Sequence, residues 1–226
     1  MAWSSILQAL WLFLPAYVAN MSPVFVAKLV PRWTAPIDGG RVGKDGQRIL
    51  GPGKTWRGLV GATLAGGLTA LLIAHVAPAE GSPGLFAGLD YGLKGHVVSA
   101  CPPGAAANGT APACEPVHQH ASFLAVFLFG AILGLMALVG DFVKSYFKRR
   151  RKIERGGSWF PFDQLDFVVF GLLGMMLAAP LLPHGWVHHA LLDDWVVLAT
   201  LFVLTPLLHL LINRIGYWLG LKEVPW

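Results

Sequence analysis

Charged side chains are scarce in this 226-residue chain. Asp, Glu, Lys and Arg make up 13% of its residues, whereas hydrophobic residues make up 55%. A soluble domain carries about 25% charged residues, and the mean hydropathy of +0.58 also lies on the apolar side. These values exclude an ordinary water-soluble domain and indicate an integral membrane protein.

Two sequence patterns that would indicate other architectures are also missing. We find no internal repeat, and this argues against the paired halves from which many transporters are built. The run Gly51-Pro52-Gly53-Lys54-Thr55 does not complete a P-loop, because that motif requires glycine at the position of Arg48. No segment has the composition of an independent soluble domain.

Long apolar runs are what the chain has instead. A hydrocarbon core about 30 Å thick requires about 20 apolar residues in a helix, and five segments approach that length. We therefore predict an all-α integral membrane protein with a single membrane domain over residues 1–226. The predicted spans cover residues 6–30, 59–76, 121–143, 167–182 and 196–211. Pro15 and Pro23 interrupt the first span, and the fourth is short.

Basic residues predict the orientation in the cell membrane. Cytoplasmic loops carry an excess of Lys and Arg, and all seventeen such residues except Lys94 fall on one side of the five-span layout. Residues 31–58 and 147–163 are therefore predicted to form cytoplasmic loops, and residues 77–120 an outer loop. The N-terminus is expected outside and the C-terminus in the cytoplasm, with a polar active site facing the cytoplasm.

The outer loop contains both cysteines of the chain, Cys101 and Cys114. A cysteine pair in an oxidising compartment favours a disulfide that closes this loop. Asn108-Gly109-Thr110 is a glycosylation sequon, which also fits an external position. The histidines of this side are interpreted as interfacial polar residues and not as a metal site.

An aspartate inside the membrane marks the candidate site. Asp141 falls at the inner end of the third predicted span, where a carboxylate is costly unless it is paired or binds a metal. Helical spacing places Asp141, Ser145 and Lys148 on one face. Arg149 adds a guanidinium group suited to phosphate oxygens. The alternative is a basic anchor for anionic lipids, in which Asp141 pairs with Lys144.

A second pair of carboxylates lies at the start of the fourth predicted span. Asp163 and Asp166 are three residues apart and share a helix face. Together with Asp141 they would form an oxygen-rich site suited to Mg²⁺ bound along with substrate phosphates. The alternative is a structural role, in which the two side chains cap the helix.

The first cytoplasmic loop ends in residues that can bind phosphate. Lys54, Thr55 and Arg57 follow a flexible Gly-Pro-Gly run and precede the second predicted span. Backbone N–H groups at a helix N-terminus attract anions, and a nucleotide triphosphate could be held there. The alternative is an interfacial turn anchored by Trp56.

The chain resembles the CTP-dependent lipid cytidylyltransferases. Ser145, Lys148 and Arg149 match the S-x-x-K-R part of the signature of CDP-diacylglycerol synthases. Pro161, Asp163 and Asp166 match its last part, but the His-Gly-Gly segment is missing and Gln164 replaces an arginine. These departures are similar to the archaeal branch, the CDP-archaeol synthases, whose pattern closes with P-x-D-Q-L-D. Further similarity lies in the run from Pro15 to Val24, in the Gly-Pro-Gly-Lys-Thr-Trp-Arg-Gly run and in the five spans.

This resemblance implies a substrate pair and roles for the candidate residues. The reaction would join CTP to an ether-linked isoprenoid lipid phosphate, 2,3-bis-O-geranylgeranylglycerol 1-phosphate, with release of pyrophosphate. Mg²⁺ is the expected cofactor, with Asp141, Asp163 and Asp166 as its ligands. The catalytic set would be completed by Ser145, Lys148 and Arg149. CTP would be bound by Lys54, Thr55, Arg57, Lys148 and Arg149.

Other functions fit parts of the same pattern. A CTP-dependent polyprenol or lipid kinase would use the same nucleotide, and a transporter of phosphorylated metabolites would use a similar basic vestibule. A structural membrane scaffold would leave Asp141 unexplained. Apart from CTP, the lipid phosphate and the bilayer, no partner is predicted, and nucleic acid is not expected. The oligomeric state stays open, although Gly61, Ala65 and Gly66 permit close helix packing.

Overall fold

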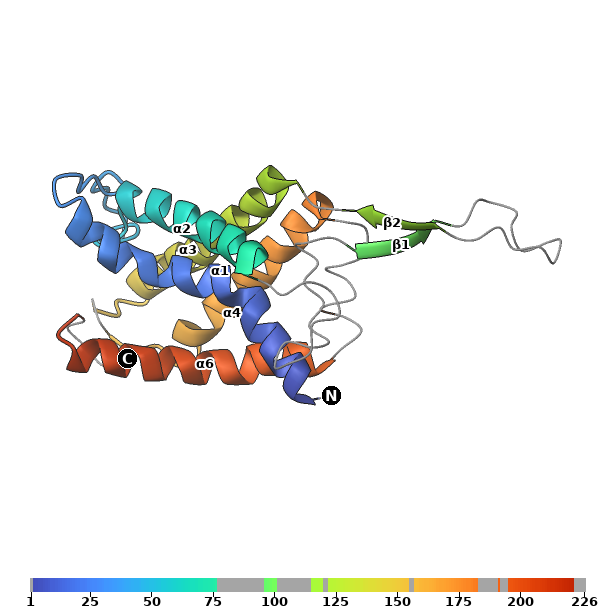
Figure 1. Ribbon diagram of the computed structural model, residues 1–226. Helices are drawn as coiled ribbons and strands as arrows, with labels where there is room; N and C mark the ends of the chain where they lie inside the picture. The colour runs from blue at the N-terminus through green and yellow to red at the C-terminus, as the bar shows by residue number, and fades with distance from the viewer. Residues whose placement is uncertain are drawn as a thin grey trace.

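A bundle of membrane-length helices forms the protein (Figure 1). The computed structural model describes residues 2–76, 96–100, 115–119, 122–154, 157–182, 191 and 195–221. Five helices in these ranges are long and apolar enough to cross a membrane, as predicted. They are α1 (Ala2–Leu29), α2 (Trp56–Val76), α3 (Phe123–Arg150), α4 (Phe162–Ala178) with the short 3-10 helix η1 (Ala179–Leu181), and α6 (Trp195–Trp218).

Two helices differ from the predicted spans in ways that matter for the site. Helix α1 runs through both Pro15 and Pro23 without a break, since neighbouring helices in a membrane can compensate for the lost backbone hydrogen bonds. Helix α3 continues past Val143 to Arg150, because Lys and Arg are good helix formers. The basic cluster therefore lies on a rigid helical turn and not in a loop.

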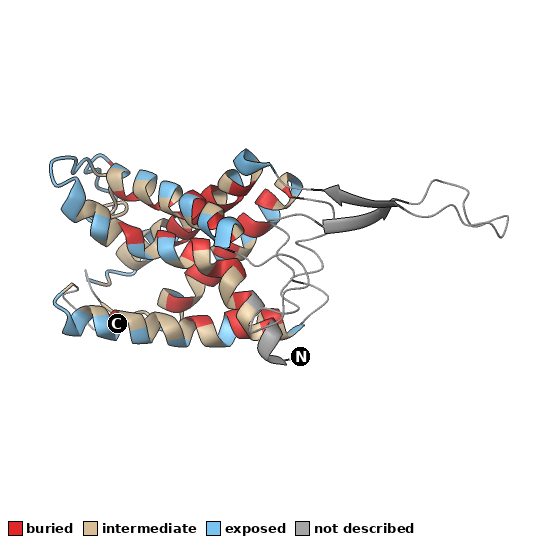
Figure 2. Cartoon of the chain, in the orientation of Figure 1, coloured by how far each residue is buried: buried red, intermediate tan, exposed pale blue. Residues whose placement is uncertain are grey.

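Helix α3 is the central element of the bundle. It packs against α1, α2 and α4, whereas α6 contacts α1 and α4. Figure 2 shows the buried residues concentrated where these helices meet. Large apolar side chains such as Leu68, Leu72 and Leu177 remain exposed on outer faces, as expected for surfaces that face lipid.

Small residues bring α2 and α3 into backbone contact. A Cβ atom added to Gly66 would collide with the carbonyl oxygen of Gly130, and one added to Gly134 would lie 2.7 Å from the carbonyl oxygen of Ala62. Gly61 faces Val26 of α1 in the same close manner. Gly61 and Gly66, considered above for helix packing, thus make close contacts within the chain.

The candidate membrane spans are all helical, and the segment 77–120 between α2 and α3 adds a feature that the sequence analysis did not include. Strands β1 (His96–Ala100) and β2 (Glu115–Gln119) form an antiparallel pair in which Val98 is opposite Val117. Valine favours strands because it is β-branched. Cys101, Cys114 and the sequon at Asn108 lie outside the described residues.

The two ends of the bundle carry different structures. Helix α1 begins near the end where the β1–β2 hairpin projects (Figure 1). The segment between α1 and α2, the last turn of α3 and the end of α6 lie at the opposite end (Figure 1). The candidate residues of the sequence analysis all belong to elements that meet at this second end.

Candidate functional site

A polar cavity of about 390 Å³ lies at this end of the bundle. It is lined by the loop before α2, the last turns of α3, the beginning of α4 and single residues of α1 and α6. Its volume is in the range of small-molecule binding pockets. Seven of the predicted site residues line it, namely Lys54, Thr55, Asp141, Ser145, Lys148, Arg149 and Asp163.

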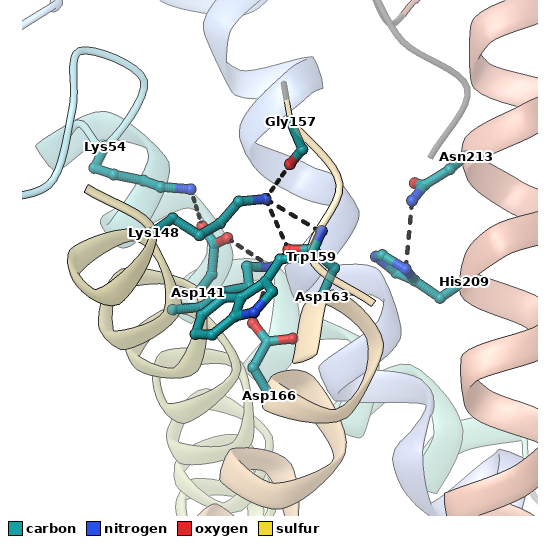
Figure 3. Close-up of polar contacts among 10 residues, drawn as sticks. Lys54, Asp141, Lys148, Gly157, Trp159, Asp163, Asp166, His209 and Asn213 are labelled. Atoms are coloured by element: carbon teal, nitrogen blue, oxygen red, sulfur yellow. Dashed lines mark hydrogen bonds and ion pairs between the residues drawn. The ribbon is translucent and has the colours of Figure 1, made fainter. Parts of the chain in front are cut away.

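Asp141 of α3 contacts the loop that precedes α2. Its carboxylate forms an ion pair with Lys54 across the cavity (Figure 3). Lys144, one turn further along α3, lies 3.4 Å from the other carboxylate oxygen. The cost of a carboxylate at this depth is thus offset by two cations. Lys54 comes from a different element, and no sequence spacing could have indicated this pairing.

Lys144 stands among all three predicted carboxylates. Its Nζ atom lies 3.0 Å from Asp166 Oδ2 and 3.8 Å from Asp163 Oδ1, in addition to its contact with Asp141. The other Asp166 oxygen, Oδ1, is buried and has no hydrogen-bond partner in the part of the chain described. The site therefore gathers negative oxygens around one lysine.

Lys148 of α3 binds the beginning of α4 and the segment that precedes it. Its Nζ atom donates to Asp163 Oδ1 at 3.0 Å, to Asp163 Oδ2 at 3.1 Å and to the Gly157 carbonyl oxygen at 2.5 Å (Figure 3). Asp163 also accepts from the backbone N–H of Trp159 at 2.6 Å. The N-cap residue of α4 is Pro161, which makes no side-chain capping hydrogen bond. Asp163 thus stabilises the segment before the helix.

The loop between α1 and α2 is held in shape by Asp38. Its carboxylate accepts from Arg48 Nη2 at 2.6 Å and from the backbone N–H groups of Gly40, Leu50 and Gly51. Burial alone would raise the pKa of the Asp38 carboxyl, but these hydrogen bonds outweigh it and lower the pKa to about 2. Gly51 adopts a φ of +116°, which favours glycine. Asp38 therefore fixes the turn that carries Lys54.

Arg150 fastens this loop to α3. It donates to Asp45 Oδ1 at 2.5 Å and to the carbonyl oxygens of Gln47 and Arg48 at 3.3 and 3.0 Å. The basic residues at the end of α3 therefore have two different roles. Lys148 and Arg149 line the cavity, whereas Arg150 binds the neighbouring loop.

Arg57 and Asp166 do not line the cavity, and Thr55 lines it while its hydroxyl is bound within α2. Arg57 donates to the carbonyl oxygens of Val30 and Pro31 at the end of α1 and is not among the lining residues. Thr55 lines the cavity, and its hydroxyl accepts from the Gly58 N–H at 3.3 Å, within the first turn of α2. Asp166 lies behind Lys144 and outside the lining.

The carboxylates suit Mg²⁺ only in part. Among the residues that the structure describes, no three or more His, Cys, Asp or Glu side chains are grouped to hold a metal ion. The oxygen donors nevertheless match the preference of Mg²⁺, and Asp166 Oδ1 is buried without a partner. Mg²⁺ is commonly held by one or two carboxylates plus substrate phosphates. The residues therefore fit an ion that arrives with a nucleotide, and not a cage of three aspartates.

Helix α6 supplies polar residues that the sequence analysis missed. His209 and Asn213 line the polar cavity from the side opposite α3, and Asn20 of α1 lies with them. Figure 3 shows His209 extending from α6 toward the carboxylate cluster. They were missed because they belong to no motif, although polar side chains four residues apart in an apolar span were a visible signal.

A second, apolar cavity of about 550 Å³ adjoins the first. It is a groove between α1 and α6, with side chains such as Leu14, Val24 and Leu208 in its wall. Asn20, His209 and Asn213 line both cavities. A polar site and an apolar groove therefore meet at these three residues.

Known proteins share both the sequence and the fold. A family model described as "CarS-like: CDP-archaeol synthase" matches residues 3–92 and 81–226. The chain belongs to the CDP-archaeol synthase family. The CDP-archaeol synthase of Methanospirillum hungatei JF-1 is 39% identical over 213 residues, which cover 94% of this chain and 99% of the relative. That of Halobacterium salinarum R1 is 37% identical and covers 98% of this chain and 97% of its own.

A solved structure is similar to this chain over nearly its whole length. It is described as an intramembrane enzyme for archaeal membrane lipids biosynthesis, and it superposes with a TM-score of 0.54. The two chains are 27% identical, with 92% of this chain and 94% of the other covered. The resemblance seen in the aspartate and lysine motifs is thus confirmed over nearly the whole length.

Proposed function

We propose that this chain transfers the cytidylyl group of CTP to 2,3-bis-O-geranylgeranylglycerol 1-phosphate and releases pyrophosphate. Its family membership makes it a nucleotidyltransferase of archaeal lipid biosynthesis. Its five candidate spans make it a multi-pass membrane protein. The observation that carries the finer proposal is the meeting of a cationic cavity with an apolar groove at one end of the bundle. A water-soluble nucleotide and a lipid require such a pair of adjoining sites.

The polar cavity suits the triphosphate of CTP. Lys54, Lys148 and Arg149 present cations from two elements, and Arg149 offers the planar donor arrangement that matches phosphate oxygens. The cavity also reaches Gly58 in the first turn of α2, where the helix N-terminus favours an anion. Thr55 borders the same turn. We do not include Arg57 among the CTP ligands, because it is bound to the end of α1.

The apolar groove suits the isoprenoid chains of the lipid. It runs along α1 and α6 and is walled mainly by aliphatic side chains. Burial of apolar chain surface stabilises binding by roughly 25 cal/mol per Å². The lipid phosphate would then reach the polar cavity where the two cavities share their lining. This placement accounts for a substrate with a large apolar part and one reactive anionic end.

The reaction needs positioning and charge neutralisation more than covalent chemistry. A lipid phosphate oxygen forms a bond to the α-phosphorus of CTP, and the bond from that phosphorus to the bridging β-phosphate oxygen breaks. Pyrophosphate leaves with the electron pair. Lys148 and Arg149 would stabilise negative charge on the transferred group. Ser145, one turn from Asp141 on the cavity wall, would orient a phosphate oxygen.

Mg²⁺ is the proposed cofactor, and Asp141 and Asp166 are the residues best placed to hold it, with Asp163 next to them. When bound, the ion would neutralise negative charge on the phosphates and on the leaving group. Lys144 now neutralises these carboxylates. Lys54 and Lys144 can turn toward phosphate oxygens when CTP enters, which frees carboxylate oxygens for the cation.

The active site is proposed to face the cytoplasm. Lys and Arg gather at the end of the bundle that holds the polar cavity, and short basic loops are retained on the cytoplasmic side. CTP is a cytoplasmic nucleotide, so this orientation also gives the site access to its substrate.

A reconstituted assay tests this function. Purified protein in liposomes would receive Mg²⁺, the geranylgeranyl ether lipid phosphate and CTP labelled in the cytosine ring or in the γ-phosphate. Ring label entering the lipid phase supports cytidylyl transfer, and a lower rate with diacylglycerol phosphate supports the ether-lipid assignment. Lipid labelled only from the γ-phosphate would establish the kinase instead. Passage of a phosphorylated metabolite across the liposome without labelled lipid would favour a transporter.

A further inference from the structure

The middle part of α1 carries three polar side chains, those of Tyr17, Asn20 and Ser22, inside a candidate membrane span. The Tyr17 hydroxyl lies 2.6 Å from Thr205 Oγ1 on α6. Ser22 Oγ donates to the carbonyl oxygen of Ala19 at 2.9 Å. In the part of the chain that the structure describes, the Asn20 amide has no hydrogen-bond partner. A polar group left unpaired in a membrane helix is costly and indicates a function.

Asn20 lies where the polar cavity and the apolar groove meet. It lines both cavities and is only partly buried, so a ligand in either cavity can reach its amide. On α1, Tyr17 and Val24 line the groove, and Pro23 lines the polar cavity. These residues are three or four positions away from Asn20, which therefore lies on the same side of the helix. The contact of Tyr17 with α6 holds this side of α1 in place one turn away.

The proposed lipid substrate brings its phosphate to this junction. Its isoprenoid chains would occupy the groove and its phosphate would react in the polar cavity, so the phosphate end lies beside residues that line both. Phosphate oxygens accept hydrogen bonds, and the NH2 group of Asn20 offers two N–H donors. Largely apolar pockets orient their ligands through a few polar groups of this kind. A neutral amide also avoids the cost of placing another charge in the membrane interior.

We propose that Asn20 is a substrate-binding residue, whose amide donates a hydrogen bond to a phosphate oxygen of the lipid at the junction of the two cavities. This inference rests on the proposed function. It gives α1 a part in the recognition of the lipid phosphate, whereas the loop before α2 and the end of α3 bind CTP. The Asn20 contact holds the attacking phosphate at the entrance of the polar cavity while the chains remain in the groove.

Steady-state kinetics with both substrates varied would test this assignment. Asn20→Leu removes the amide and keeps a side chain of similar size, and it should raise KM for the lipid phosphate by about 10–100-fold, the effect of losing a hydrogen bond to a charged group. KM for CTP should stay within about twofold. Asn20→Ala should give the same result, which separates loss of the donor from altered packing. Asn20→Gln keeps an amide donor and should recover part of the loss.

Equilibrium binding without CTP distinguishes the phosphate from the rest of the lipid. The probes are the geranylgeranyl ether lipid phosphate and the same lipid with a hydroxyl group in place of the phosphate. Asn20→Leu should weaken binding of the lipid phosphate by about 10–100-fold and should not weaken binding of the alcohol. Ser22→Ala is the matched control, because the Ser22 hydroxyl is bonded within α1, and it should leave binding of both probes within about twofold.

Several results would overturn the role of Asn20. Unchanged binding of the lipid phosphate in Asn20→Leu would remove the contact, and equal weakening of the alcohol would place Asn20 against the chains or the glycerol. A rise in KM for CTP as large as that for the lipid, or a lost preference for CTP over UTP, would assign Asn20 to the nucleotide.

The proposed function can fail separately from this inference. Failure of the wild-type protein to move cytosine label would contradict cytidylyl transfer, yet the binding measurement would still test Asn20, because it requires no reaction. A wild-type protein that transfers the label while Asn20→Leu binds the lipid phosphate normally would leave the function intact and refute the contact. A wild-type protein that binds no lipid phosphate would overturn both.

Discussion

At the scale of single residues, the negative charge of Asp141 faces the positive charges of two lysines, and its removal should affect the reaction. Asp141 is paired with Lys54 and lies 3.4 Å from Lys144. Asp141→Asn keeps the shape of the side chain but removes the charge that both cations face. We expect kcat to fall by about 10²–10³-fold, the range seen when one electrostatic contact of a reaction centre is lost. Cytosine-label transfer at saturating CTP and lipid measures this.

Glu154→Gln is the control for that substitution. It removes an exposed carboxylate near the end of α3 and should leave kcat within about twofold. The response to Mg²⁺ gives a second readout, because a carboxylate that holds the ion should raise the Mg²⁺ concentration needed for half-maximal rate when it is lost. An Asp141→Asn enzyme with near-full activity and an ordinary Mg²⁺ response would contradict the central role of Asp141.

The Asp38 carboxylate makes the loop before α2 sensitive to acid. Its pKa of about 2 is below the ordinary value of 3.8. A carboxyl with a lowered pKa stabilises the folded loop above the unfolded value and loses this contribution as the pH falls through the folded value. We therefore expect the protection of backbone N–H groups in residues 31–55 to weaken between about pH 4 and pH 2. Hydrogen exchange read by mass spectrometry, corrected for the intrinsic pH dependence, measures it.

In Asp38→Asn the same segment should exchange faster at pH 6 and lose that acid dependence. Asp45→Asn provides the comparison within the loop, because Asp45 accepts from Arg150 and from the Gln47 N–H at the surface. Exposed ion pairs of this kind contribute little to stability. Equal protection of the loop in wild-type protein and Asp38→Asn would show that Asp38 does not organise it.

The sequence could identify the residues of α3 and α4 because their chemistry repeats at helical spacing. Asp141, Ser145 and Lys148 were placed on one face from that spacing, and the structure lines the cavity with all three. Contacts between distant segments could not be predicted in this way. The pairing of Lys54 with Asp141 and the position of His209 depend on how the loop and α6 pack against α3. Arg57 was assigned by its neighbours in sequence and has other partners.

At the scale of elements, the close approach of α2 and α3 fixes the distance between the two sides of the site. Gly66 and Gly130 face each other with no room for a Cβ atom. Gly66→Val would push the helices apart, and overpacking of this kind costs about 1–3 kcal/mol. Because α2 is preceded by the loop of Lys54 and α3 carries Asp141, we also expect a higher KM for CTP. Thermal unfolding in detergent and initial rates measure the two effects.

Leu68→Val tests whether the position matters. It places the same valine side chain on the same helix, but at a position where the native Leu68 is 60% exposed. Its melting temperature and KM for CTP should stay close to those of the wild-type protein. If Gly66→Val behaved like Leu68→Val, the glycine contact would not set the spacing of α2 and α3.

Helix number was predictable, whereas helix ends were not. Apolar length is a direct consequence of the thickness of the bilayer, and five spans follow from it. Ends depend on local interactions that hydropathy does not report. Helix α3 keeps its hydrogen-bonded geometry through polar residues to Arg150, and α1 continues past two prolines. The β1–β2 pair was overlooked because a short strand pair leaves little signal in an apolar chain with a Gly- and Pro-rich loop.

At the scale of the whole molecule, the two ends of the bundle differ in charge and in structure. The polar cavity, the loop between α1 and α2 and the basic turn of α3 occupy one end, and the β1–β2 pair occupies the other (Figure 1). With an odd number of spans, the start of the first helix and the end of the last helix lie on opposite sides of the membrane. The distribution of Lys and Arg then favours one of the two possible orientations.

Cysteine labelling in intact cells or sealed right-side-out vesicles would test this orientation. In a background with Cys101 and Cys114 replaced by serine, Lys44→Cys places a thiol on the exposed loop between α1 and α2, and Glu115→Cys places one in β2. We expect a membrane-impermeant maleimide to label position 115 in intact vesicles and position 44 only after permeabilisation. The reverse pattern would put the cavity outside, away from CTP, and would contradict the cytoplasmic site. Labelling of both positions in vesicles that retain a trapped dye would contradict the five-span arrangement, because an odd number of crossings separates the two positions only if α2 spans the bilayer.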